Sequence, residues 1–117
     1  MASELSVGIQ FTFAKDGAGV TKSAAFQVTI SGSYHVSGVQ NVGTSDETIA
    51  LGDIATNGWC YFKNLDSTNF VTLGADGSSY PIKLKAGEAA VLRWNGAAVH
   101  VKADTASCKV EYGIIDN

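Results

Sequence analysis

Few residues of this chain have side chains that can carry out catalysis. The sequence contains two histidines, His35 and His100, and two cysteines, Cys60 and Cys108. Nucleophilic catalysis needs a base beside a hydroxyl or thiol group, with a third group that orients the base. Both histidines lie in strand-like runs, at positions typical of ordinary sheet residues. The sequence therefore predicts no catalytic residue, and it predicts that the protein is not an enzyme.

The potential metal ligands do not have the spacing of a metal site. A zinc site takes three or four ligands, usually with close pairs such as C-x-x-C or H-x-H, and the sequence has no such pair. Its aspartates also lack the D-x-D-x-D-G spacing of a calcium loop. We expect four of them to accept hydrogen bonds within their own turns, and these are Asp66, Asp76, Asp104 and Asp116. The sequence predicts neither a metal nor another cofactor.

The two cysteines allow one disulfide at most. Cys60 stands between Trp59 and Tyr61 in a strand-like run, and Cys108 opens the last such run, so both are predicted to be small buried hydrophobic residues. The N-terminal residues MASELSVG lack the basic-then-apolar order of a signal peptide. Reduced thiols are therefore favoured over a disulfide.

Aromatic rings are the remaining candidates for ligand binding, because a flat ring face can stack on a sugar. Alternation within the predicted strands directs most of the rings into a core, Trp94 above all. Trp59, beside a turn, is a weaker core candidate. The full set is Tyr34, Trp59, Tyr61, Tyr80, Trp94 and Tyr112. A carbohydrate- or receptor-binding module of a tail or fibre is the alternative function that these rings leave open.

Hydrophobic residues alternate with polar ones along nearly the whole chain, which is the pattern of strands with one buried face. The alternation is clearest in residues 5–13, 26–30 and 109–115, and no segment shows a sustained helical period. Turn signals recur every eight to twelve residues. The sequence predicts an all-β protein: an antiparallel β-sandwich, jelly-roll-like, of eight to ten short strands.

Two connections are predicted in more detail. Asn95-Gly96 is the preferred pair for a type I′ turn, so we expect a hairpin in which Trp94 lies opposite Ala97. The same register pairs Leu92 with Val99 and Ala90 with Val101. Between the first two strands, the Gly- and Lys-containing segment Ala14 to Ala25 is expected to be a mobile loop.

Composition narrows the classes of partner. A chain of 117 residues is predicted to form a single β-sandwich domain over residues 1–117. With 45% hydrophobic and 16% charged residues, its surface must be largely uncharged, which suits close contact with another protein. The net charge of −3 and the scattered lysines argue against nucleic acid. No apolar run approaches the ~20 residues of a membrane span, so we expect no membrane partner.

Several motifs resemble those of small β-sandwich structural proteins of tailed-bacteriophage virions, such as capsid decoration or cement proteins. They are the N-L-D-x-T-N-x-V segment at Asn64–Val71 and the lysine-glycine-glutamate turn at Lys85–Glu88, within a similarity that covers about Gly38 to Ile115. The resemblance implies a non-enzymatic virion protein, made in the host cytoplasm and placed on the capsid surface. It implies the major capsid protein or another virion protein as partner, and a homo-oligomer, with a trimer favoured.

The predicted partner-binding residues are charged side chains set in uncharged surroundings. Lys15, Asp16 and Lys22 lie in the predicted loop, among glycines and alanines that allow close approach of another backbone. Arg93 is the fourth candidate, because arginine is enriched in the centres of protein interfaces, and the alternative is a solvated strand residue.

Overall fold

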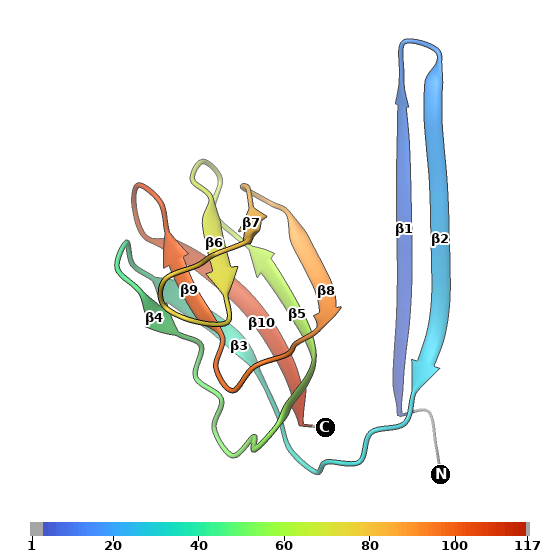
Figure 1. Cartoon of the computed structure of the whole chain (residues 1–117). Coiled ribbons are helices and arrows are strands. Elements are labelled where there is room, and N and C mark those ends of the chain that lie inside the picture. Colours follow the sequence, from blue (N-terminus) through green and yellow to red (C-terminus); the bar gives the residue numbers. More distant parts are fainter. Residues whose placement is uncertain (1–3, 117) are drawn as a thin grey trace. The chain divides into compact units, whose positions relative to one another are not determined.

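The computed structural model describes residues 4–116, and this part of the chain contains ten strands and no helix. The backbone divides into two compact units, Met1–Ser31 and Gly32–Asn117. The first unit holds two strands and the second holds eight (Figure 1). The all-β prediction is confirmed, and all the strands of the sandwich belong to the second unit.

The first unit is a long antiparallel hairpin of β1 (Leu5–Lys15) and β2 (Ala18–Val28). The strands pair without interruption from Leu5 with Val28 to Lys15 with Ala18, side by side along their whole length (Figure 1). Asp16 and Gly17 form the turn with φ values of 51° and 82°. Positive φ at both central residues is the requirement of a type I′ turn, whose twist matches that of the strands.

The expectation of a mobile loop over Ala14 to Ala25 is wrong. Both strands continue through this segment to the two-residue turn. Asp-Gly is itself a strong hairpin signal. It was obscured because one side of β2 reads Ala18, Val20, Lys22 and Ala24, so small and charged residues interrupt the hydrophobic alternation.

Gly17→Val should destabilise the hairpin by about 1 to 2 kcal/mol, because a β-branched residue is strained at positive φ. A Cβ at this position meets no atom within 4 Å, so the strain comes from the backbone alone. Gly17→Asn is the matched control, since asparagine tolerates this conformation. Amide hydrogen exchange of β1 and β2 should accelerate in the valine variant only. Equal exchange in both variants would contradict the turn assignment.

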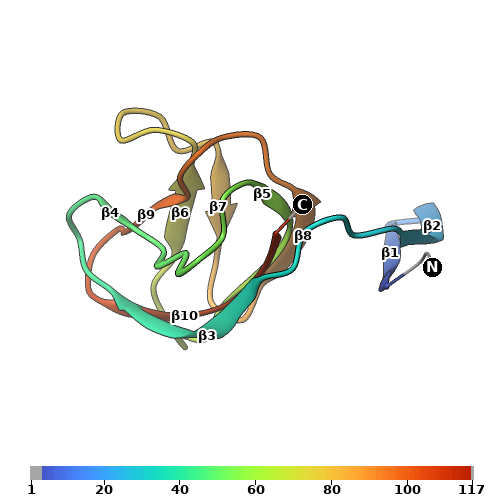
Figure 2. The ribbon, with the colours of Figure 1, turned by 90° about the horizontal axis from the view of Figure 1, so that it is seen from below.

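The second unit is a sandwich of two four-stranded antiparallel sheets (Figure 2). One sheet has the order β3-β10-β5-β8 and the other the order β4-β9-β6-β7. Most consecutive strands lie in different sheets, which is compatible with the predicted jelly-roll-like connectivity. The bounds are β3 (His35–Val42), β4 (Glu47–Thr48), β5 (Asn57–Asn64), β6 (Val71–Gly74), β7 (Ile82–Leu84), β8 (Ala89–Arg93), β9 (His100–Ala103) and β10 (Cys108–Asp116).

Alternate residues of the two sheets enclose the core of the sandwich. Phe62 of β5 is fully buried and makes an edge-to-face contact with Trp94, with ring centres 5.8 Å apart. The buried cluster comprises Val42, Ile49, Cys60, Phe62, Val71, Leu73, Leu84, Trp94, Val99, Val101, Ala103, Cys108, Val110 and Ile114. Every member belongs to residues 32–117, so the second unit has a hydrophobic core of its own.

The predicted hairpin at Asn95-Gly96 does not form. β8 pairs with β5, whereas β9 pairs with β4 and β6, so the segment between them crosses from one sheet to the other. Gly96 has a φ of 152° and Asn95 has no positive φ, although a type I′ turn needs both. The buried Trp94 ring donates from Nε1 to the Ala98 carbonyl at 3.0 Å. The prediction of Trp94 as a core residue is therefore confirmed, and its predicted pairing is wrong.

Candidate partner-binding surfaces

The hairpin has two different faces, because successive side chains of a strand point to opposite sides. We call one the apolar face: Leu5, Val7, Ile9, Phe11, Phe13 and Lys15 of β1, with Ala18, Val20, Lys22, Ala24, Phe26 and Val28 of β2. We call the other the small face: Ser6, Gly8, Gln10, Thr12 and Ala14 of β1, with Gly19, Thr21, Ser23, Ala25 and Gln27 of β2.

Large residues of the apolar face are accessible to solvent. The exposed fraction is 62% for Phe11, 49% for Phe13, 44% for Ile9 and 43% for Val20. A sheet that is apolar on one face must bury that face against another layer, and a two-stranded ribbon has no second layer of its own. The apolar face is therefore the candidate partner-binding surface of the hairpin.

The structure brings together three of the four predicted partner-binding residues. Lys15 and Asp16 lie at the tip of the hairpin, and Lys22 lies on its apolar face directly opposite Phe11. Arg93 belongs to the sandwich, at the end of β8, with its guanidinium 5.5 Å from the centre of the Trp59 ring. The prediction that these residues bind a partner stays a prediction.

Sequence reasoning missed a second surface, the solvent face of the β3-β10-β5-β8 sheet. Its exposed large residues are Val39, Tyr61 and Val91, and Tyr61 pairs with Val91 on one side and with Gly113 on the other. A Cβ at Gly113 would meet no atom within 4 Å, so the sheet surface has open space there. The alternation of Tyr61 with buried Cys60 and Phe62 was the sequence signal for this face.

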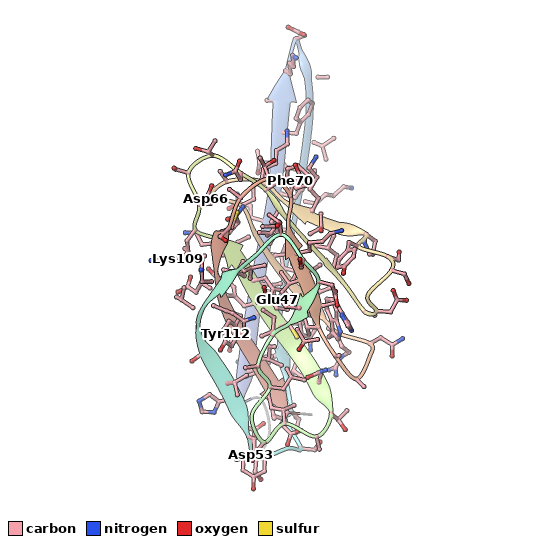
Figure 3. All side chains as sticks on the ribbon, turned by 90° about the vertical axis from the view of Figure 1, so that its left-hand side faces the viewer. Glu47, Asp53, Asp66, Phe70, Lys109 and Tyr112 are labelled. Carbon is pink, nitrogen blue, oxygen red and sulfur yellow. The ribbon has the colours of Figure 1, made fainter. Side chains whose placement is uncertain are left out.

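Two of the four turn aspartates accept hydrogen bonds from backbone nitrogens within their own turns, as predicted. Asp66 Oδ2 accepts from the backbone nitrogens of Thr68 and Asn69, at 2.9 and 2.6 Å, and Asp76 Oδ1 accepts from those of Ser78 and Ser79. These bonds lower the pKa of both carboxyl groups. Figure 3 shows Asp66 at the same end of the sandwich as Phe70 and Asp53 at the opposite end.

Of the other two turn aspartates, only Asp116 accepts a hydrogen bond from outside its own turn. Asp116 Oδ1 accepts from the backbone nitrogen of Thr56, 60 residues away in the sequence, so it connects distant segments. Asp104 Oδ2 accepts from the hydroxyl of Thr105. Within residues 4–116 no three His, Cys, Asp or Glu side chains converge to hold a metal ion.

A polar cluster around Asp46 joins three segments of the sandwich. His100 Nδ1 lies 3.0 Å from Asp46 Oδ1, and the Tyr80 hydroxyl donates to the same oxygen. The bond from Tyr80 is the main cause that lowers the pKa of Asp46, and it raises the pKa of Tyr80 to about 12. Lys102 Nζ lies 4.8 Å from the Tyr80 ring centre. His100 is thus a partner of a carboxylate that ties loops together, which its strand-like sequence context did not reveal.

Cys60 and Cys108 are free thiols buried in the sandwich. Burial raises the pKa of Cys60 to about 12. Cys60 should therefore stay unmodified by a thiol reagent at pH 8 in the folded protein and react once the protein unfolds. Because an unfolded thiol titrates near 9.0, the unfolded chain releases this proton first, and Cys60 should lower stability as the pH rises from 9 towards 12. Rapid modification of Cys60 in the native protein would contradict its placement in the core.

Within the described residues, no helix has the length and apolar character needed to cross a membrane. Comparison of the whole chain with known proteins found no match among protein-family models, curated proteins or solved structures.

Proposed function

We propose that this protein is a non-enzymatic structural protein of a tailed-bacteriophage virion, a decoration or cement protein that binds and stabilises the lattice of the major capsid protein. The observation that carries the proposal is the exposed apolar face of the hairpin, in a chain whose second unit already has a hydrophobic core. A chain of this kind keeps apolar surface available for assembly with other proteins.

The motifs behind the resemblance to virion proteins support the proposal through the loops that they build. Asn64 and Asp66 organise the connection from β5 to β6. Glu88 Oε1 accepts from the Lys85 backbone nitrogen at 2.9 Å, and the Gly87 nitrogen donates to the Asn64 carbonyl at 3.0 Å. The two motifs, far apart in sequence, therefore fix adjacent loops of one sandwich.

In the proposed mechanism, each copy buries surface in several small contacts with the shell, and the symmetry of the shell repeats these contacts many times. The protein acts as a homo-oligomer, with a trimer favoured, on the capsid surface after synthesis in the host cytoplasm. The tip residues Lys15 and Asp16 and the stacked Arg93 are the charged contacts in this proposal. A glycan-binding role has less support, because Trp94 lies in the core and Tyr112 packs against it.

The test is binding of the purified protein to capsids that lack it, measured by co-sedimentation. Binding should saturate at a copy number set by the lattice and should raise the temperature at which the shell disrupts. Arg93→Ala should weaken binding about tenfold, as expected for loss of an interface arginine. Lys83→Ala, an exposed lysine on β7 of the other sheet, is the matched control. No binding by the unmutated chain would refute the decoration role.

A further inference from the structure

We propose that the apolar faces of hairpins from different copies of this chain pack against one another in a parallel, rotationally symmetric bundle. In this bundle β1 of one copy lies against β2 of the next, with the tips together. The inference rests on the homo-oligomer of the proposed function and deepens it: the apolar face joins the copies of the chain, and the oligomer binds the shell through its other surfaces.

The hairpin needs a second layer to cover its apolar face. Its strands have 11 residues each, which at the usual rise corresponds to a ribbon about 36 Å long. Isolated two-stranded hairpins are at best marginally stable in water. With Phe11 and Phe13 about half exposed or more, the face retains a large apolar area that another layer can cover.

The apolar face is complementary to itself in the sizes of its side chains. At successive levels of the ladder, large residues of β1 pair with smaller or flexible residues of β2: Ile9 with Ala24, Phe11 with Lys22, and Phe13 with Val20. Rotation about an axis parallel to the strands brings β1 of one copy against β2 of the next at the same level. Each large ring then meets a smaller side chain, so the layers can interdigitate.

The charged residues of the hairpin also favour the parallel arrangement. Lys22 is the single charged residue of the apolar face between Leu5 and Phe13, and the parallel arrangement sets its ammonium beside the Phe11 ring of the next copy, a favourable cation–π contact. At the tips, Lys15 of one copy meets Asp16 of its neighbour. If the hairpins closed into a barrel, the Lys22 ammonium would be buried away from water, which is costly. We therefore infer that the hairpins pack as layers whose edges stay open to water.

The first experiment measures the mass of the full-length chain in solution by sedimentation equilibrium. The unmutated protein should be a homo-oligomer. The double variant Phe11→Ser, Phe13→Ser should associate at least about 100-fold more weakly, because two large apolar side chains leave the contact. Thr12→Ser, on the small face, is the control and should leave association unchanged. Thermal unfolding reports separately that the sandwich remains folded, since its core lies in residues 32–117. A monomeric unmutated protein, or an oligomer that persists in the double variant, would overturn the inference.

The second experiment tests the parallel arrangement with a bifunctional thiol reagent that spans about 10 Å, the usual separation of facing sheets. Ala18→Cys places a thiol on the apolar face at the tip, and Thr21→Cys places one on the small face as the control. The native thiols Cys60 and Cys108 are buried, so the new thiol is the reactive one. Covalent dimers should form in the Ala18 variant and not in the Thr21 variant. An oligomer without the Ala18 cross-link would contradict the parallel bundle. Neither experiment uses capsids, so the result is independent of the decoration role.

Discussion

Replacing Asn64 with alanine should lower the free energy of unfolding by about 2 to 4 kcal/mol. Asn64 is fully buried at the end of β5. Its Nδ2 donates to the carbonyls of Asn69 and Leu84 at 2.8 and 3.0 Å, and its Oδ1 accepts from the Asp66 nitrogen at 2.9 Å. Alanine removes these three hydrogen bonds and leaves a small cavity. Buried backbone groups without a partner are costly because water does not reach them.

Denaturant unfolding of the full-length chain measures this change. Asn41→Ala is the matched control, since Asn41 is exposed on β3 and its replacement should change the free energy of unfolding by less than about 0.5 kcal/mol. A loss of under 1 kcal/mol for Asn64→Ala would show that the loop between β5 and β6 does not depend on this side chain.

Gly74→Ala should destabilise the sandwich by about 3 kcal/mol or more. A Cβ on Gly74, at the end of β6, would overlap the backbone oxygen of Ser79. Because that atom belongs to the backbone, the loop before β7 must move to make room. The movement would also displace Tyr80, whose hydroxyl donates to Asp46. We therefore expect the melting temperature to fall and the contact between these loops to weaken.

Gly113→Ala provides the comparison for this clash. Gly113 also lies within a strand, but a Cβ there meets no atom within 4 Å, and its φ is not positive. Alanine at such a site restricts the unfolded chain and should stabilise the protein by up to about 1 kcal/mol. If the two variants unfold at the same temperature, the close approach of Gly74 to Ser79 is not present in solution.

Strand periodicity predicted the all-β class and placed Trp94 in the core, because alternation is a local property that burial of one face imposes. The connections were harder to predict. Asn95-Gly96 has the composition of a hairpin turn, yet Trp94 packs between the sheets and the chain passes from one sheet to the other. Whether a local turn preference or the burial of a large ring prevails depends on how the whole core packs. The pattern of a single sequence does not show that packing.

The candidate surfaces were predicted in part. The charges Lys15, Asp16 and Lys22 were recognised as members of a loop. The alternation of residues 5–13 predicted a strand with its apolar side buried, whereas Ile9, Phe11 and Phe13 on the apolar face are exposed. Recognising that face requires the register, which the Asp16-Gly17 turn sets. Contacts such as His100 with Asp46 join residues 54 positions apart and follow only from the fold.

Electron cryo-microscopy of capsids incubated with this protein tests the proposed function most directly. The proposal predicts additional density at symmetry-related positions on the outer surface of the shell, large enough for the sandwich. The density should be absent from capsids without the protein. Particles that carry no such density after incubation with a saturating amount of the folded chain would contradict the proposal that this protein decorates a capsid.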